Sequence, residues 1–163
     1  MYSQLVSPKA IAVFALLVLA GLVAAQQQQP IDFPHNKHVA QGLECLDCHS
    51  FADTQAQATI PSVRKCMLCH EKHATDGPGV KILADYYKKG IEVPWRRVYG
   101  FDKLASVKFR HAPHVRANVA CATCHGDVAH MTVAVKAVEH NMGTCISCHR
   151  QNHASDDCVT CHY

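Results

Sequence analysis

Apolar residues are concentrated in one N-terminal run and are otherwise scattered along the chain. The run extends from Ala10 to Ala25, follows Lys9 and ends in small residues. Its 16 residues are more than most secretory signals need and fewer than the roughly 20 of a membrane-spanning helix. Residues 1–25 therefore predict an apolar N-terminal helix that is either a signal peptide, cleaved before Gln26, or an uncleaved membrane anchor.

Both interpretations place the rest of the chain outside the cytoplasm. We therefore expect a periplasmic protein, either soluble or anchored to the outer face of the cytoplasmic membrane. The glutamine tract that follows the apolar run, residues 26–29, reads as a polar linker.

A helical pattern is visible in one later segment. Between Val80 and Gly90, the residues Val80, Leu83, Ala84 and Tyr87 share one face, and Gly90 suits a C-terminal stop. Elsewhere aliphatic residues are thinly spread, and aromatic residues make up 7% of the chain. The sequence therefore predicts little regular secondary structure, a few short helices, and too few apolar side chains for a large conventional core.

Composition and charge exclude several classes of function. The formal net charge is +3 and the basic residues are dispersed, which is too weak a pattern for nucleic-acid binding. The sequence contains no phosphate-binding loop and no Gly-x-Ser-x-Gly nucleophile elbow. We assign no catalytic residue.

All ten cysteines belong to five copies of one motif, Cys-x-x-Cys-His. In chain order the motifs are Cys45/Cys48/His49, Cys66/Cys69/His70, Cys121/Cys124/His125, Cys145/Cys148/His149 and Cys158/Cys161/His162. We number them sites 1 to 5. Cys-x-x-Cys-His is the attachment motif of c-type haem: the two thiols form thioether bonds to one haem, and the adjacent histidine ligates its iron.

Two other uses of the cysteines fit the motif less well. Zinc would take four ligands from pairs of motifs and leave five adjacent histidines without a role. Disulfides are expected in an exported protein, but they do not require a histidine after every second cysteine. The sequence therefore predicts five covalently attached haems c, which together form most of the core, and an apoprotein that is largely unfolded.

Eight further histidines are available as second, distal ligands to the irons. They are His35, His38, His73, His111, His114, His130, His140 and His153. Five positions need filling, so every iron can have two histidine ligands. Such irons transfer electrons, whereas an iron with an open side can bind a substrate.

One pattern, Phe-x-His-x-x-His, occurs twice. Phe33, His35 and His38 precede sites 1 and 2, and Phe109, His111 and His114 precede sites 3 to 5. Histidines three residues apart on a helix lie side by side, so each pair can reach two adjacent haems. We expect these four histidines to be distal ligands.

The segment from Phe109 to His162 resembles the class III multihaem cytochromes c of the trihaem type. It has the Phe-x-His-x-x-His pattern, three haem motifs and His140 shortly before the middle motif, although the gap from His140 to Cys145 is slightly longer than is usual. The resemblance implies the distal–proximal pairs His114–His125, His111–His149 and His140–His162. Applied to the first half of the chain, it implies the pairs His38–His49 and His35–His70.

A wider resemblance covers most of residues 30–163. The order of features is similar to that of the pentahaem subunit of alternative complex III and related quinol-oxidising membrane complexes. The matching segments are Val93-Pro94-Trp95-Arg96-Arg97-Val98, residues 107–111, residues 121–126, Met131 and residues 142–150; Thr144 departs from that family, which often has Trp there. This resemblance implies a quinol-linked membrane partner.

We expect four regions: the signal or anchor (1–25), a dihaem segment (26–73), a linker or docking insertion (74–108) and a trihaem module (109–163). Within the insertion, Trp95, Arg96, Arg97 and Tyr99 form either a docking surface for another subunit or a set that packs on a haem and pairs with its propionates.

The predicted function is electron transfer along five bis-histidine haems, between a quinol-linked membrane partner and periplasmic acceptors. A mobile periplasmic shuttle and a multihaem reductase with one open haem are the alternatives. Five residues remain as competing ligands: His73, His130, His153, Met131 and Met142.

Overall fold

The computed structural model describes residues 28–163, and the predicted N-terminal apolar helix lies outside them. Within the described residues there is no β-strand. The helices are α2 (His35–Val39), α3 (Cys45–Cys48), α4 (Val63–His70), α5 (Pro78–Lys89), η1 (Lys103–Ala105), α6 (His111–Arg116), α7 (Cys121–His125), η2 (Val128–His130), α8 (Met142–Gln151) and α9 (Cys158–Cys161). The expectation of short helices joined by irregular segments is confirmed.

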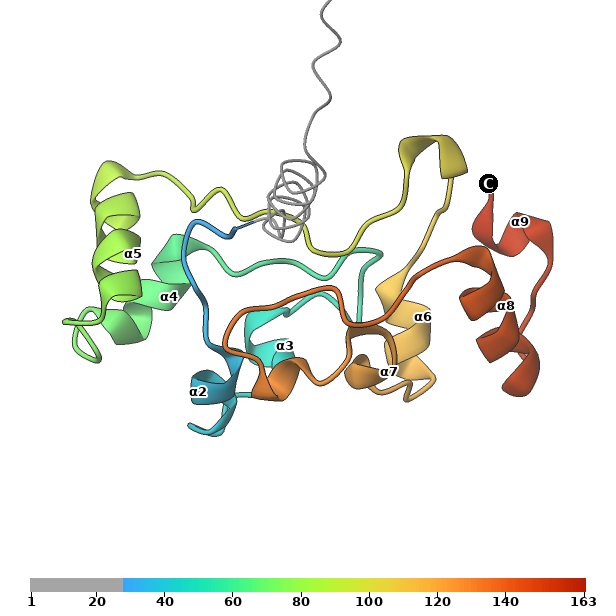
Figure 1. Ribbon diagram of the computed structural model, residues 1–163, viewed down its shortest axis with the longest axis horizontal. Helices are drawn as coiled ribbons and strands as arrows, with labels where there is room; N and C mark the ends of the chain where they lie inside the picture. Colours follow the sequence, from blue (N-terminus) through green and yellow to red (C-terminus); the bar gives the residue numbers. More distant parts are fainter. Residues whose placement is uncertain (1–27) are drawn as a thin grey trace, which may run out of the picture.

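The helices are spread along an elongated body (Figure 1). Helices α4 and α5 lie near one end of its long axis, and α8 and α9 lie at the other, with α3 and α7 between them. None of the helices in residues 28–163 has both the length and the apolar character needed to cross a membrane.

Helix α5 confirms the pattern read from Val80 to Gly90. Pro78 is at its first turn, where a missing N–H costs nothing, and Gly90 ends it in the left-handed conformation with φ +67°. Leu83 faces inward and packs with Ile31, Val63, Met67 and Val93 in a cluster between α4, α5 and the segments beside them.

Side chains alone form only a small core. Among the described residues seven hydrophobic side chains are buried, and no side chain is less than 2% exposed. Large apolar residues within the haem motifs are open to solvent, for example Leu68 at 75% and Val159 at 74%. This agrees with the expectation that the polypeptide supplies only part of its own core.

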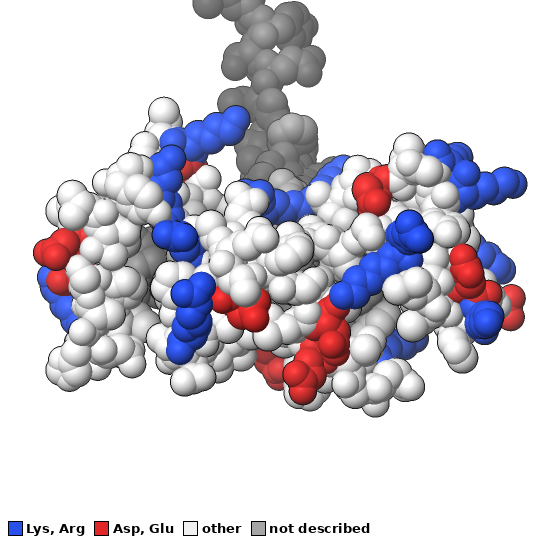
Figure 2. All heavy atoms as spheres, turned by 180° about the vertical axis from the view of Figure 1, so that it is seen from behind, with Lys and Arg blue, Asp and Glu red and all other residues white. Residues whose placement is uncertain are grey.

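The face turned away in Figure 1 carries charges of both signs. Figure 2 shows Lys and Arg interspersed with Asp and Glu across that face, with broad uncharged areas between them. No single-sign field of the kind that binds nucleic acid is present on this face.

Gly126 directly follows site 3. The backbone conformation at this position and the close neighbours around it both require glycine. Its φ and ψ are +70° and −169°, a region that is essentially restricted to glycine. A Cβ at this position would lie 2.6 Å from the Cβ of Ala137. The glycine thus allows the segment before His140 to approach site 3 closely.

We therefore predict that Gly126→Ala lowers the free energy of unfolding of the haem-loaded protein by about 2 kcal/mol or more, from backbone strain and the clash with Ala137. Gly90→Ala is the matched control. Its φ is also positive, but it has open space around it, so we expect a loss of about 1 kcal/mol. Denaturant unfolding followed by haem absorbance measures both, and equal losses would contradict the role given to Ala137.

Candidate haem sites

Each of the five motifs lies on a short helix, which places its two cysteines on one face. Helices α3, α7 and α9 begin at the first cysteine of sites 1, 3 and 5. In α4 and α8 the first cysteine of sites 2 and 4 comes one turn later, after N-caps in which Ser62 and Asn141 accept hydrogen bonds from backbone N–H groups. The spacing of three residues brings both thiols toward one partner.

No two of the ten cysteines are joined by a disulfide within residues 28–163. Burial raises the pKa of the thiols of Cys45, Cys48, Cys66, Cys124 and Cys145. Within residues 28–163 no cluster of three or more His, Cys, Asp or Glu side chains is arranged to hold a metal ion.

The second cysteines of sites 2 and 4 differ in their surroundings, although the motif predicts equivalent roles for them. Cys69 is exposed, and Cys148 is half-buried. The Sγ atom of Cys148 lies 3.6 Å from Nδ2 of Asn152, which also donates to the carbonyl oxygen of Cys148 at 2.9 Å. Haem attachment through Cys69, Cys148 and the other eight cysteines stays a prediction.

Burial separates the predicted ligands from the spare histidines. Nine of the ten predicted ligands are half-buried, and His162 is exposed; the nine are His35, His38, His49, His70, His111, His114, His125, His140 and His149. In contrast, His73, His130 and His153 are all exposed. His130 pairs with Asp127, with Nδ1 2.7 Å from a carboxylate oxygen.

The imidazoles of six predicted ligands are oriented by the same kind of hydrogen bond. In each, Nδ1 lies within hydrogen-bonding distance of a backbone carbonyl oxygen, at 2.5 to 3.1 Å. The pairs are His38–Pro34, His49–Thr59, His70–His73, His111–Ala56, His114–Arg110 and His149–Ser155. With Nδ1 donating its proton, Nε2 keeps a free lone pair, which is how proteins prepare a histidine to bind a metal.

His35 differs in a way that also fits a ligand. Its Nδ1 is buried and has no hydrogen-bond partner. Burial lowers the pKa of His35, and the neighbouring His49 and His38 lower it further. A neutral imidazole buried beside a second one is suited to metal ligation.

Ring-centre distances show which histidines lie close enough together to be ligands of one iron. Two imidazoles on opposite sides of one metal ion have ring centres about 6 Å apart, because each metal–nitrogen bond is about 2 Å long and the nitrogen is about 1 Å from the ring centre. The ring centres of His38 and His70 are 6.0 Å apart, those of His111 and His125 are 6.2 Å apart, and those of His114 and His149 are 6.0 Å apart. The donor sets therefore fit haem iron.

These proximities differ from the order that the class III resemblance implied for the second half of the chain. The resemblance paired His114 with His125 and His111 with His149, whereas the ring centres that lie close together are those of His111 and His125 and those of His114 and His149. The physical reason is a long-range contact. The carbonyl oxygen of Ala56 accepts from the backbone N–H of His111 at 2.9 Å and lies 3.0 Å from its Nδ1, which the N–H of Ala58 also approaches at 3.3 Å. These contacts fix the start of α6 beside site 3.

The first half differs from the implied order in the same way. The ring centre of His38, which the resemblance paired with His49, lies close to that of His70. The third implied pair, His140–His162, remains a prediction. In the described structure His140 lies near His125, with ring centres 6.1 Å apart at 73°, and its Nε2 is 2.7 Å from the carbonyl oxygen of Cys124.

The repeated phenylalanine positions both histidines of its pair, a role that the sequence did not indicate. Phe33 lies 4.3 Å from His38 at 21° and 4.8 Å from His35 at 81°. Phe109 lies 4.7 Å from His114 at 31° and 4.8 Å from His111 at 87°. In both copies one histidine lies roughly parallel to the phenyl ring and the other meets it edge-on, so the sequence repeat is also a structural repeat.

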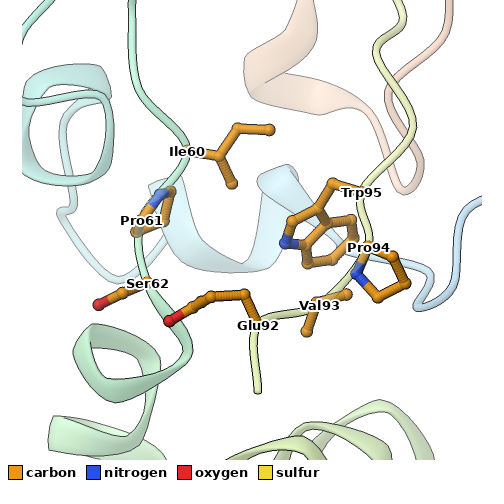
Figure 3. Close-up of a pocket in the computed structure, with 7 residues that line it drawn as sticks. All are labelled: Ile60, Pro61, Ser62, Glu92, Val93, Pro94 and Trp95. Atoms are coloured by element: carbon orange, nitrogen blue, oxygen red, sulfur yellow. The ribbon is translucent and has the colours of Figure 1, made fainter.

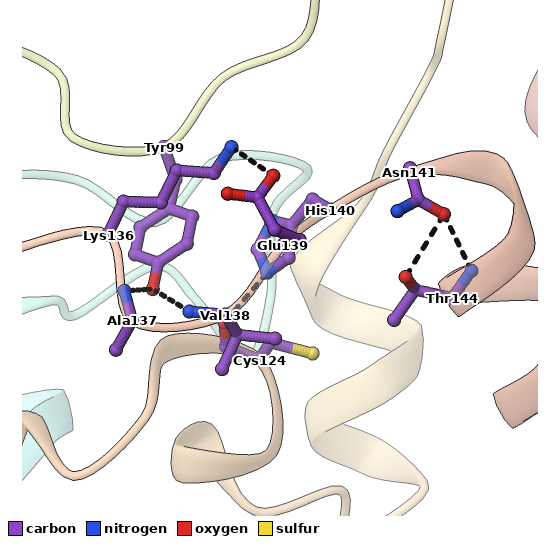
Figure 4. Close-up of polar contacts among 9 residues, drawn as sticks. All are labelled: Tyr99, Cys124, Lys136, Ala137, Val138, Glu139, His140, Asn141 and Thr144. Atoms are coloured by element: carbon purple, nitrogen blue, oxygen red, sulfur yellow. Dashed lines mark hydrogen bonds and ion pairs between the residues drawn. The ribbon is translucent and has the colours of Figure 1, made fainter.

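Tyr99 makes the same two contacts in the insertion. Its ring lies 4.6 Å from His140 at 26° and 4.8 Å from His125 at 89°. Its hydroxyl accepts hydrogen bonds from the backbone N–H groups of Ala137 at 2.9 Å and Val138 at 3.2 Å (Figure 4). Tyr99 thus holds the segment that carries His140 against site 3.

Trp95 is half-buried and packs against the apolar cluster that contains Leu83. Its ring is 6.4 Å from Phe33, and it lines a shallow hollow of about 510 Å³ with Ile60, Pro61, Ser62, Glu92, Val93 and Pro94 (Figure 3). Arg96 and Arg97 beside it are exposed. Packing of Trp95 on a haem, pairing of the arginines with its propionates and docking of another subunit all stay predictions.

The two methionines flanking site 4 differ in exposure. Met142 is 69% exposed. Met131 is half-buried, and its carbonyl accepts from the N–H of Asn36 at 3.1 Å. That contact joins η2 to α2.

Two comparisons with known proteins agree with this geometry. Residues 31–88, which include sites 1 and 2, match the family of cytochrome c7 and related cytochrome c. The chain is also 31% identical over 178 aligned positions to the multihaem cytochrome c subunit of menaquinone reductase from Nitratidesulfovibrio vulgaris, covering 92% of this chain and 84% of the relative. The chain is a multihaem cytochrome c. As a member of this family the cytochrome carries covalently attached haem.

We predict that Tyr99→Phe lowers the free energy of unfolding of the cytochrome by about 1 kcal/mol, because two backbone N–H groups lose their acceptor. Tyr87→Phe is the control, since Tyr87 is exposed and has no hydroxyl hydrogen bond within the described residues. We expect it to have no measurable effect in urea unfolding. Equal effects of the two substitutions would show that the Tyr99 hydroxyl does not hold the segment before His140.

Proposed function

We propose that this multihaem cytochrome is a pentahaem electron-transfer protein in which every iron has two histidine ligands. The observation that carries the proposal is the set of three imidazole pairs with ring centres 6.0 to 6.2 Å apart, each joining a motif histidine to one from a Phe-x-His-x-x-His repeat. Haem supplies the one-electron chemistry. The chain attaches it, orients its ligands and shields it from solvent.

Each haem is assigned its own residues. The thioether attachments are the two cysteines of each motif, in site order Cys45 and Cys48, Cys66 and Cys69, Cys121 and Cys124, Cys145 and Cys148, and Cys158 and Cys161. The proximal ligands are His49, His70, His125, His149 and His162. As distal ligands we propose His35 for site 1, His38 for site 2, His111 for site 3, His114 for site 4 and His140 for site 5.

A ligand on both faces of each iron leaves no coordination position for a substrate, which favours electron transfer over a reductase activity. The carbonyl-bound Nδ1 atoms support this assignment, because rings held in one orientation change little when the iron changes oxidation state. The exposed spare histidines are not needed as ligands.

The proposed partners are a quinone-linked membrane complex and a periplasmic redox protein. The support is the relative, which is a subunit of menaquinone reductase, together with the resemblance to quinol-oxidising complexes. We propose a location on the outer face of the cytoplasmic membrane, and membrane association through the partner or the apolar segment 1–25.

Replacement of His114 tests the ligand assignment. We expect His114→Ala to leave the iron of site 4 with one protein ligand and to open that haem to carbon monoxide. In the carbonyl form, the shifted proton NMR signals should belong to His149 and its haem. His130→Ala, at an exposed histidine, should bind no carbon monoxide. Shifts at His125 instead would restore the pairing that the class III resemblance implied.

Redox coupling to the quinone pool tests the partner. In membranes from cells that produce the protein, we expect the haem absorbance to change with the menaquinol to menaquinone ratio. The purified cytochrome mixed with the same quinones should respond much more slowly, since it lacks the membrane partner. If the haem absorbance in native membranes does not change with the menaquinol to menaquinone ratio, a mobile shuttle is favoured instead.

A further inference from the structure

The contacts between motifs follow an order that differs from the order of the motifs in the sequence. Each contact joins two sites through one short protein segment, and we call such a contact between neighbouring sites a junction.

Sites 2 and 1 are neighbours across α2. The ring centre of His38 of this helix lies 6.0 Å from that of His70 of site 2, and His35, one turn earlier, is the residue proposed as the distal ligand of site 1. The side-chain amine of Lys65, on α4 just before site 2, donates to the backbone carbonyl of Asp47 within site 1. One five-residue helix therefore serves both sites.

Site 3 lies against site 1. The loop after site 1 holds its own proximal histidine, because Nδ1 of His49 is 2.6 Å from the carbonyl oxygen of Thr59. The same loop holds His111 through Ala56, and His111 faces His125 of site 3 with nearly parallel rings, at 7°. Arg116 Nε donates to the carbonyl of Asp53 at 3.2 Å.

A second contact, between two helices, also places site 3 next to site 1. Helix α2 packs against η2, which follows site 3. The junction between the two halves of the chain therefore joins site 3 to site 1.

Sites 3 and 4 share helix α6, as sites 1 and 2 share α2. His111 faces His125 of site 3, and His114, one turn on, faces His149 of site 4. Sites 4 and 5 are joined by Ser155. Its carbonyl oxygen is 2.5 Å from Nδ1 of His149, and its hydroxyl is 2.9 Å from the hydroxyl of Thr160, within site 5.

From these junctions we infer that the five haem sites form one row in the order 2, 1, 3, 4, 5, with sites 2 and 5 at its ends. The inference rests on the proposed function, since a row matters only if electrons cross it. Figure 1 shows the helices of the sites in agreement, with α4 near one end of the molecule, α3 and α7 in the middle, and α8 and α9 at the other end. Electrons enter and leave at sites 2 and 5, and site 1, the first in the sequence, is internal.

The row also explains the insertion, residues 74–108. Site 2 ends the first half of the chain and lies at one end of the row. The chain must therefore pass back beyond site 1 to reach site 3, where its second half begins. The insertion makes this return along the whole row. Val93 packs in the cluster beside α4, the Tyr99 hydroxyl is 3.3 Å from the carbonyl oxygen of His125 in site 3, and the N–H of Lys108 donates to the carbonyl of Cys161 in site 5 at 2.8 Å.

Proton NMR of the fully reduced wild-type cytochrome tests the order. Low-spin ferrous haems are diamagnetic, so each haem can be assigned to its motif through contacts with its own cysteines and histidine. We expect haem-to-haem nuclear Overhauser contacts for the pairs 2–1, 1–3, 3–4 and 4–5. Contacts between haems 2 and 3, with none between haems 1 and 3, would overturn the row and restore the sequence order.

The same spectrum separates failure of the row from failure of the proposed function. Fewer than five diamagnetic haems, or paramagnetically shifted signals from an open ferrous haem, would contradict the five bis-histidine sites. The remaining contacts between haems would still decide the order.

Removal of single haems gives an independent test. In Cys45→Ala/Cys48→Ala, which lacks the internal site 1, we expect haem 2 to drop out of fast electron exchange with the others in partly reduced samples. In the control Cys66→Ala/Cys69→Ala, which lacks the end site 2, exchange among the remaining haems should persist. The reverse result would overturn the row, and if a variant does not fold, the wild-type contacts remain decisive.

Discussion

The hydrogen bond from imidazole Nδ1 to a backbone carbonyl is the interaction on which the rest of this structure depends. The polypeptide buries few side chains, so its compact state requires the haems, and the haems require histidines held at fixed positions. Carbonyls supplied by loops and by preceding helical turns hold six of these rings. A backbone acceptor cannot be removed by substitution of its side chain, which makes this a robust way to orient a ligand.

The two Phe-x-His-x-x-His segments hold their histidines by the same local contacts. In each copy the second histidine donates to the carbonyl four residues earlier, and the phenylalanine contacts both rings. In the proposed row each copy supplies ligands to two haem sites: α2 connects sites 2 and 1, and α6 connects sites 3 and 4. Tyr99 extends the same aromatic contact to His140 from a distant part of the chain, and it does so without the repeat.

The sequence predicted the parts of the sites that depend on local spacing. The five motifs, the histidine repeats and the helix ending at Gly90 could all be read from residue order, because helical periodicity fixes which side chains share a face. The ring pairing could not. His111 and His114 are locally equivalent candidates, and the choice between sites 3 and 4 depends on Ala56, about fifty residues earlier. The positions of Tyr99 and Trp95 likewise depend on long-range packing.

The central claim is that five haems are each held by two histidines. Low-temperature EPR of the fully oxidised cytochrome tests this most directly. The account predicts only low-spin ferric signals, which integrate to five irons per chain. A high-spin signal from about one iron in five would reveal an open coordination position, and it would contradict the assignment of this chain as an electron conductor without a substrate site.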